Sequence, residues 1–528
     1  MNQRKRNVTL VVICLMLATF AHAQAPAAQP SYSNPVIAGD YPDPSIIRTG
    51  DDYWATATGS EWAPVYPILH SHDLVNWKLV GSVFPDPPSW AEGSFWAPEI
   101  SEYKGKFYVF YTARKRGGPL CVASASSDAP AGPYHDNGPL MCQEDGSIDA
   151  FPVIDENGVR YLIWKEDGNS RNQPTPLWAQ PLSEDGTTLI GEPKEILRNE
   201  RTSWEGGVVE GPFVLRRNGH FYIFYSGNAC CGLKCNYALG VARSEKLLGP
   251  YEKSPRNPLV RSNSTWKCPG HGSVVTDQQG RTFLLYHAYG ARDFIFVGRE
   301  AVLDEISWGA DNWPTINGNN GVSVRAISPL GAVQRADNNF LDHFESRELL
   351  PGWQWPQGHR PVITLTTENE GVISLAPGSG ERNDRLAAVL ARPTLAGNYV
   401  ATTSILTGSL VAGAEAGLAA FGDLKNAMGV SIATDGITLW ERRNGRTTTM
   451  SKLPAVNATQ VQLRMAVKKG YELQFAFSAD GKKWTPIGNK LQGVSLAPWD
   501  RSIRVAIFSG GAGQIPAKFG YVRIVTEP

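Results

Sequence analysis

A short motif recurs five times in the first three hundred residues, and this repeat constrains the fold more than any other feature. Each copy is a glycine turn followed by an apolar and aromatic run, as in "YKGKFYVFYTA" and "RRNGHFYIFYSG". Successive turn glycines are 55, 53, 61 and 61 residues apart, at Gly50, Gly105, Gly158, Gly219 and Gly280. A period of this length holds about four short strands. The chain therefore uses one structural unit five times.

The middle strands of these units are apolar on both faces, which is typical of sheets stacked against other sheets. Few windows show helical periodicity, so the sequence indicates an all-β class. Radial stacking of five four-stranded sheets makes a five-bladed β-propeller, which we predict over residues 34–325. A solenoid would show the same period, but an open array needs capping units, and the sequence offers no candidates.

The pattern changes after the repeats, and alternating strands such as "VQLRMAVKKGYELQFAFSADGKKWTPIG" follow. The Asp-Gly pair in "SADGKKW" is a hairpin signal. We predict a separate β-sandwich of the jelly-roll type over residues 335–528. In this domain Asp342 and Glu345 could contribute to a structural calcium site, although a solvated acidic edge is the favoured interpretation.

The first residues, "MNQRKRNVTLVVICLMLATFAHA", combine a cationic start, a short apolar run and an A-x-A site. This pattern predicts a signal peptide over residues 1–23, followed by a flexible lead-in over residues 24–33 and export to the periplasm or beyond. No later run is apolar for the roughly 18 residues that a membrane span needs. Lys plus Arg and Asp plus Glu both number 50, so no net field attracts nucleic acid or an anionic membrane.

Export favours disulfides among the six cysteines that follow the signal peptide. The simplest pair is Cys121 with Cys142. The other four allow three pairings, including a vicinal bridge, and are Cys230, Cys231, Cys235 and Cys268. A zinc site is the competing interpretation, since Cys268 and His271 form a C-x2-H pair.

The first strand of each blade lines the axis of a propeller, so residues at one repeat position form a ring. Counting back twelve residues from the aromatic after each turn reaches Trp96, Asp149, Glu210 and His271 in four blades. Asp43 breaks this count, because it lies ten residues before Tyr53. The count predicts that carboxylates from different blades meet near the axis.

Carboxylates that converge repel one another, which raises at least one pKa and suits acid and base chemistry. Glycoside hydrolysis needs two such groups, one protonated and one ionised. Aromatic side chains suit the faces of sugars, and we expect one wall from Trp96, with Trp54, Phe151 and Trp204 as its neighbours. Glu99 lies three residues beyond the repeat position, and we interpret it as structural.

Several motifs together resemble glycoside hydrolase family 43. They are "NPVIAGDYPDPSIIRTGDDYW", "FWAPEI", "SIDAFPVIDENG", "VVEGPFVLRRNGHFYIFYS" and "PGHGSVV", and they cover about residues 33 to 320. The resemblance implies a five-bladed propeller that hydrolyses β-D-xylosides, α-L-arabinofuranosides or arabinans with inversion. The later segment "NNFLDHFESRELLPGWQWPQ" resembles the concanavalin-like domain that often follows these propellers.

The resemblance also implies roles. Asp43 would be the general base, held toward the channel by Pro42 and Pro44, whose rings limit backbone freedom. Glu210 would be the general acid, and Asp149 would orient it and raise its pKa so that it stays protonated near neutral pH.

Two further positions follow from the resemblance. His271 matches an axial histidine that helps to hold calcium through water in arabinanases of the family, so a metal is possible here although no cofactor is required. Arg299 matches an arginine that faces the substrate.

The leading hypothesis is an exported hydrolase that removes terminal α-L-arabinofuranosyl or β-D-xylosyl residues from plant cell-wall hemicellulose. Arabinofuranosides are favoured slightly, because "ATATGSEWAPVYPILHSHDLVNW" resembles the exo-acting members. The alternatives are a β-xylosidase acting on xylo-oligosaccharides and a non-catalytic carbohydrate-binding propeller. A protein-binding propeller of the WD type is disfavoured, since no blade carries the Gly-His and Trp-Asp signature.

Overall fold

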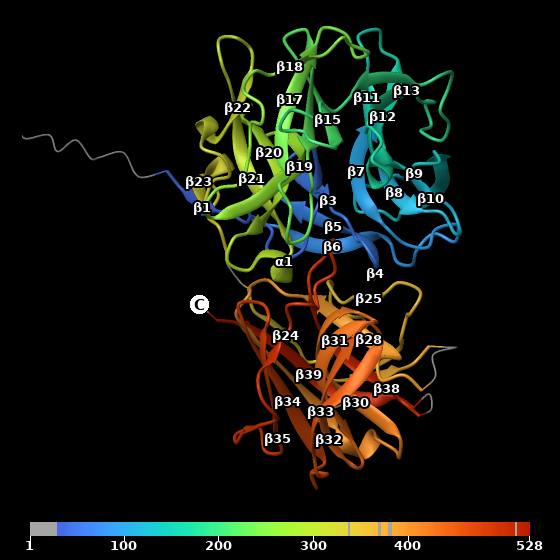
Figure 1. Cartoon of the computed structure of the whole chain (residues 1–528), viewed down its shortest axis with the longest axis vertical. Helices are drawn as coiled ribbons and strands as arrows, with labels where there is room; N and C mark the ends of the chain where they lie inside the picture. Colours follow the sequence, from blue (N-terminus) through green and yellow to red (C-terminus); the bar gives the residue numbers. More distant parts are fainter. Residues whose placement is uncertain (1–28, 336–337, 368–370, 379–382, 513–514, 528) are drawn as a thin grey trace, which may run out of the picture.

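The structure is a computed structural model that describes residues 29–335, 338–367, 371–378, 383–512 and 515–527. Two β-rich domains lie end to end, with the first coloured blue to yellow and the second orange to red (Figure 1). The predicted signal peptide lies outside the described residues. The last three residues of the predicted flexible lead-in form a strand instead. This strand, β1 (Ser31–Ser33), pairs with β23 (Arg325–Ile327).

Within residues 29–335 the chain forms five antiparallel sheets of four strands, as the repeat predicted. Blade 1 contains β2 (Ser45–Thr49), β3 (Asp52–Thr56), β5 (Val65–Ser71) and β6 (Lys78–Phe84). Blade 2 contains β7 (Trp96–Tyr103), β8 (Lys106–Arg114), β9 (Leu120–Ser127) and β10 (His135–Met141). Blade 3 contains β11 (Ser147–Ile154), β12 (Arg160–Glu166), β13 (Leu177–Pro181) and β14 (Lys194–Leu197).

Blade 4 contains β15 (Val209–Arg217), β16 (His220–Gly227), β17 (Ala238–Ser244) and β18 (Glu252–Lys253). Blade 5 contains β19 (Trp266–Thr276), β20 (Thr282–Gly290), β21 (Arg299–Trp308) and β22 (Pro314–Ile316). The inner strands touch in the closed order β2, β7, β11, β15, β19 and β2. This closed order confirms the five-bladed propeller and excludes an open solenoid.

No blade combines strands from the start and the end of the propeller sequence, because each blade is built from one continuous segment. The segment before β2 crosses β21, where the Asn34 amide accepts a hydrogen bond from the Leu303 backbone and donates one back to it. The Tyr32 hydroxyl donates to the same Leu303 carbonyl. Blade 5 is therefore fastened to the start of the chain by buried hydrogen bonds.

The second domain is a sandwich of two antiparallel sheets, in agreement with the predicted class. In the described part of residues 338–527, the larger sheet has nine strands, β24 (Phe340–Asp342), β26 (Val362–Thr366), β27 (Val372–Ala376), β29 (Tyr399–Leu406), β34 (Gln460–Lys468), β35 (Glu472–Ser478), β36 (Thr485–Pro486), β37 (Leu491–Gln492) and β39 (Ala517–Thr526). The smaller sheet there has six, β28 (Ala388–Pro393), β30 (Ala414–Asp423), β31 (Asn426–Ala433), β32 (Gly436–Arg443), β33 (Arg446–Leu453) and β38 (Arg504–Gly511).

Helical structure is confined to short pieces in the described residues, namely α1 (Phe294–Val297), η1 (Gly168–Arg171), η2 (Asn317–Asn319), η3 (Pro329–Gly331) and η4 (Thr407–Ser409). None of the helices in those residues has the length and apolar character that crossing a membrane requires.

The six cysteines in the described residues form three disulfides. Cys121 bonds Cys142, as expected, and the remaining pairs are Cys230–Cys231 and Cys235–Cys268. The zinc interpretation is wrong, because the sulfur of Cys268 is already bonded to Cys235.

The expectation that Asp342 lies on a solvated acidic edge of the second domain is also wrong, because Asp342 is buried. One of its carboxylate oxygens accepts the backbone N–H of Phe344 and the other accepts the indole N–H of Trp353. Because both oxygens of Asp342 accept hydrogen bonds from the protein, the structure does not support a calcium site formed by Asp342 and Glu345.

The two domains are joined by a strand pair and by buried charges. A short strand of the propeller, β4 (Trp62–Ala63), pairs with β25 (Trp355–Pro356) of the second domain. The Asp40 carboxylate accepts the backbone N–H of Ser502 at 2.9 Å and lies 3.4 Å from the buried Arg504 guanidinium. Figure 1 shows the loops of the sandwich reaching the propeller at this boundary.

We predict that Asp40→Ala lowers the free energy of unfolding by about 3–5 kcal/mol, because it leaves Arg504 buried without a counter-charge. The measurement is urea denaturation. The matched control is Asp86→Ala, which removes an exposed ion pair to Arg360 across the same boundary and should cost about 0–1 kcal/mol. Equal losses in the two variants would contradict this account of the boundary.

Candidate active site

Each blade places a left-handed residue at an equivalent position in or just before its inner strand. These residues are Asp43, Ala97, Asp149, Gly211 and His271, with φ of 52°, 41°, 58°, 60° and 45°. In β7, β11, β15 and β19 the residue falls in a break of the strand register. Such bulges turn a side chain out of the pleat. Here they direct side chains from different blades into one place.

The backbone N–H of each of these five residues donates a hydrogen bond to a side chain of the preceding blade. The acceptors, in blade order from Asp43 to His271, are His287 Nδ1, Thr58 Oγ1, Thr112 Oγ1, Asp149 Oδ2 and Ser226 Oγ. The five bonds connect all neighbouring blades around the axis, so each bulge is held relative to the next.

In two blades, counting back twelve residues from the aromatic reaches the residue before the left-handed one. Trp96 pairs with Thr112 and Glu210 with Ser226, so both precede the left-handed residue of their strand. The cause is turn length. Blades 2 and 4 have two-residue turns at 104–105 and 218–219, whereas blades 3 and 5 have five-residue loops at 155–159 and 277–281.

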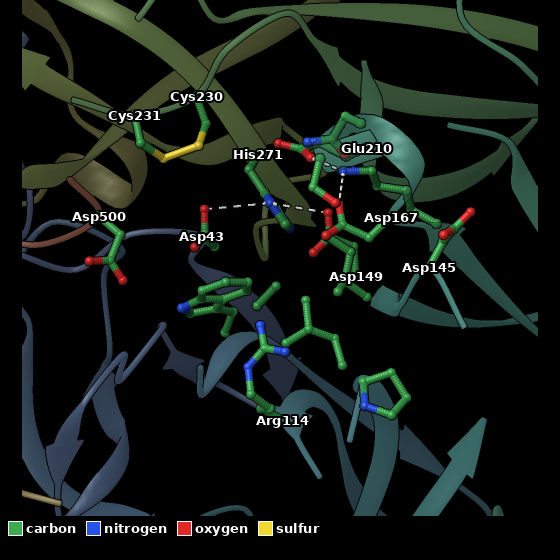
Figure 2. A pocket seen from close by; sticks show the side chains of 18 of the residues that line it. Asp43, Arg114, Asp145, Asp149, Asp167, Glu210, Cys230, Cys231, His271 and Asp500 are labelled. Atoms are coloured by element: carbon green, nitrogen blue, oxygen red, sulfur yellow. Dashed lines mark hydrogen bonds and ion pairs between the residues drawn. A yellow bond between two sulfur atoms is a disulfide. The ribbon is translucent and has the colours of Figure 1, made fainter. Parts of the chain in front are cut away.

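A cavity of about 440 Å³ opens where these strands begin. It is lined by six of the predicted site residues, namely Asp43, Trp96, Asp149, Glu210, His271 and Arg299. Figure 2 shows the three carboxylates gathered around His271. The sequence therefore identified side chains that meet in space although they come from five blades.

Trp54 and Phe151 do not line this cavity, so the expectation that they contact substrate there is wrong. Trp54 lies on the second strand of its blade, where its ring packs 4.5 Å from that of His70. Phe151 lies past the bulge of β11, and its ring packs 4.7 Å from Phe213. It lines a separate hollow with Glu99, farther along the inner strands.

Asp43 is surrounded by cationic and hydrogen-bonding groups. Arg299 Nη1 donates to Oδ1 at 3.0 Å, and the Thr58 hydroxyl donates to Oδ2 at 2.6 Å. His271 Nδ1 and His287 Nδ1 lie 3.5 and 3.2 Å from Oδ1. Burial alone would raise the pKa of Asp43, but Arg299 and then His271 outweigh it and hold that pKa well below its usual range. The carboxylate is therefore ionised.

Glu210 has a buried lysine as its partner. Lys165 Nζ, on β12, lies 2.7 Å from one carboxylate oxygen of Glu210 and 2.8 Å from Asp167. The Tyr237 hydroxyl donates to the other oxygen at 2.8 Å. Burial raises the pKa of Glu210, but Lys165 and Tyr237 reverse that effect, and the net pKa is lowered. The expectation of a raised pKa on Glu210 itself is therefore wrong.

The raised pKa belongs to Asp149 instead. Burial brings it to about 7, and the negative charges of Glu210 and Asp43 add to the rise while His271 and Lys165 oppose it. The negative charge of Glu210 raises the pKa of Asp149, so we treat the two carboxyl groups as one titrating pair. Near neutral pH this pair retains one proton in a cavity that also holds the ionised Asp43.

Several lining residues were not anticipated. Lys165 carried a signal that could have been used, because a lysine in the apolar run "YLIWK" needs a buried partner. Trp499 and Asp500 come from the second domain, and no repeat pattern points to them. The Trp499 ring lies 5.9 Å from that of Trp96, and Arg299 donates to the Asp500 carbonyl at 3.1 Å.

One side of the His271 ring faces two carboxylates. Its Nδ1 lies 3.5 Å from Asp43 and 3.9 Å from Asp149. Among the described residues, the group with three converging ligand atoms is Asp52, His70 and His72, on the outer part of blade 1. We therefore assign no step of the chemistry to a metal at His271.

Comparison with known proteins agrees with this geometry. The family described as "Glycosyl hydrolases family 43" matches residues 32–314, and the "Beta xylosidase C-terminal Concanavalin A-like domain" matches residues 341–510. The solved structure of the GH43 protein BlXynB from Bacillus licheniformis is 26% identical, with a TM-score of 0.82, and the match covers 94% of this chain and 100% of that one.

Two curated relatives are similar over shorter stretches. A protein named "Xylosidase/arabinosidase" from Butyrivibrio fibrisolvens is 30% identical over 305 residues, which are 54% of this chain and 56% of that protein. A "Non-reducing end alpha-L-arabinofuranosidase" from Bacteroides ovatus is 27% identical over 434 residues, which are 78% of each chain. The chain thus spans little more than half the length of the first relative.

We predict that Gly211→Ala lowers the free energy of unfolding by about 2 kcal/mol or more, because a left-handed non-glycine residue alone costs about 1–2 kcal/mol. In addition, a Cβ there would lie 2.9 Å from the His271 ring. The measurement is chemical denaturation beside Gly81→Ala, whose Cβ would meet nothing within 4 Å and should change stability by about 0.5 kcal/mol or less. A neutral Gly211→Ala would contradict the assigned bulge geometry.

Proposed function

Because the chain belongs to glycosyl hydrolases family 43, we propose that it removes terminal α-L-arabinofuranosyl or β-D-xylosyl residues from hemicellulose with inversion. The observation that carries this proposal is the meeting of Asp43, Asp149 and Glu210, from three blades, in one cavity. Two carboxyl groups of opposite protonation state are what hydrolysis of a glycosidic bond requires. A binding module has no need of a buried carboxylate kept ionised beside a carboxyl pair that retains a proton.

Asp43 is the general base. Arg299 keeps it ionised, so the carboxylate can accept a proton from the water that attacks the anomeric carbon. The Thr58 hydroxyl donates a hydrogen bond to one oxygen of Asp43, and Arg299 donates one to the other. These two bonds fix the orientation of the carboxylate and so the direction of its remaining lone pairs. Asp43 therefore positions the water as well as activating it.

Glu210 is the general acid, and Asp149 supports it. The pair retains one proton up to about pH 7, because Asp149 has its pKa raised to that value. Lys165 lowers the pKa of Glu210, which favours the proton on Asp149. Transfer of the shared proton to Glu210 then precedes its donation to the leaving oxygen.

The position of the second domain beside the cavity supports removal of single terminal sugars. The second domain contributes Trp499 and Asp500 to the lining, so the cavity is bounded by both domains. A cleft that accepts the middle of a polysaccharide would need both ends open.

The choice of sugar has two candidates. Arabinofuranosyl and xylosyl residues are both pentoses, and relatives carrying both names are similar to this chain. We favour the arabinofuranoside, and a β-xylosidase acting on xylo-oligosaccharides is the second candidate. The partner in both cases is an arabinose- or xylose-containing saccharide, and no cofactor takes part in the proposed chemistry.

Export to the periplasm or the medium is part of the proposal. Three disulfides in the described residues support it, because such bonds persist in oxidising compartments. Polymeric hemicellulose is also found outside cells.

We predict that Asp43→Asn lowers kcat/KM by about 10³-fold or more on nitrophenyl arabinofuranoside and xyloside, because the base is lost. Glu210→Gln should lose less on these substrates than on a disaccharide, since nitrophenolate leaves without a proton. The measurement is steady-state kinetics on both aryl substrates and on the disaccharide. Wild-type rates in both variants would contradict the catalytic assignment, and Asp185→Asn, on an exposed turn, serves as the control.

We predict that kcat/KM falls as the pH rises through about 7, because the Asp149–Glu210 pair then loses its shared proton. In Asp149→Asn the fall should move to lower pH, since Glu210 keeps the pKa-lowering partner Lys165 and lacks an anionic neighbour. The measurement is the pH profile of kcat/KM for an aryl substrate. If the fall of kcat/KM in Asp149→Asn occurs at the same pH as in the wild type, then a group other than this pair controls it.

A further inference from the structure

A second cavity adjoins the catalytic one. Its volume is about 450 Å³, close to the 440 Å³ of the first. The two share five lining residues, Asn169, Glu210, Cys230, Cys231 and Trp499. Asp43 lines the first cavity and is absent from the lining of the second. The second cavity therefore extends the catalytic cavity at Glu210 and away from Asp43.

The position of Glu210 decides what the second cavity can hold. In an inverting hydrolase the acid protonates the oxygen that departs with the leaving group, while the base activates water on the opposite face of the cleaved sugar. The leaving sugar must then lie on the acid's side. The volume, the adjacency and the shared Glu210 make the second cavity the place for it.

Trp499 and the Cys230–Cys231 disulfide form the apolar part of the surface that the two cavities share, and Asn169 and Glu210 form its polar part. The Trp499 side chain is 60% exposed, an unusual state for a tryptophan inside a concave site. Beside it, the half-buried disulfide Cys230–Cys231 presents polarisable sulfur with no hydrogen-bond donor. Figure 2 shows this disulfide among the side chains that line the catalytic cavity. Sugar rings pack their C–H faces on surfaces of this kind.

The loop that carries the disulfide is held in place. It connects β16 to β17, and Cys235–Cys268 fastens it to β19. Within the loop the Asn236 N–H donates to the Ala229 carbonyl, and the Gly232 N–H donates to the Tyr289 hydroxyl. The bond between adjacent cysteines also closes a covalent ring that stops local rotation. A surface ordered in advance binds a ligand at lower entropic cost.

We infer that the second cavity binds the leaving-group sugar, and that the Cys230–Cys231 disulfide and Trp499 are the surfaces on which its ring packs. The amide side chain of Asn169 and the Arg201 guanidinium line the same cavity and offer partners for the hydroxyl groups of a saccharide. This inference rests on the proposed function and extends it to the leaving-group side. The disulfide acts by positioning and takes no part in bond cleavage.

The test compares two substrates of one enzyme. A disaccharide with the cleaved sugar at its non-reducing end occupies the second cavity, whereas the corresponding glycosyl fluoride leaves it empty. The readout is the ratio of kcat/KM on the disaccharide to kcat/KM on the fluoride, which is independent of the fraction of folded enzyme. In the double variant Cys230→Ser/Cys231→Ser this ratio should fall about tenfold, and Trp499→Ala should lower it similarly.

Leu233→Ser is the matched control, because Leu233 lies in the same loop, is 63% exposed and lines neither cavity. Its ratio should equal that of the wild type. An unchanged ratio in the cysteine variant and in Trp499→Ala overturns the inference, as does an equal fall in Leu233→Ser. A wild-type enzyme that hydrolyses neither substrate overturns the proposed function instead.

Discussion

The hydrogen bonds between neighbouring blades at the starts of the inner strands are the constraint on which the rest of the site depends. Each blade places a left-handed residue there whose N–H is held by a side chain of the blade before it. This ring fixes the position of each bulge relative to its neighbours. Asp43 and Asp149 occupy two of these positions, and Glu210 directly precedes a third. The convergence of the acids is thus a consequence of how the blades are joined.

Buried charge then distinguishes the three acids. Asp43 has Arg299 and Glu210 has Lys165, and each cation lowers the pKa of its partner. Asp149 has His271 at the longer distance of 3.9 Å, and burial raises its pKa to about 7. Lys165 is shared between Glu210 and Asp167, so Arg299 and Lys165 together do not neutralise all the acids around them. A proton that remains on Asp149 and Glu210 near neutral pH is what acid catalysis needs.

Much of this could be predicted from local sequence, and the remainder depends on distances that local sequence does not encode. The turn glycines and apolar runs predicted the propeller, because they repeat with the blade. The ring position was one residue off at Trp96 and Glu210, since turn lengths differ between blades. The conformation of Asp43 was also missed, because a residue before proline usually avoids the left-handed region. Trp499 could not be found, since it depends on how one domain docks on another.

The central proposal is that water, directed by Asp43, displaces the leaving sugar in one step while Glu210 protonates it. Proton NMR of the sugar in the first minutes of hydrolysis tests this claim directly, because it records the anomer before mutarotation. The account predicts that an α-L-arabinofuranoside releases the β anomer first, or that a β-D-xyloside releases the α anomer. Initial release with the configuration of the substrate retained would require a covalent intermediate and would contradict it.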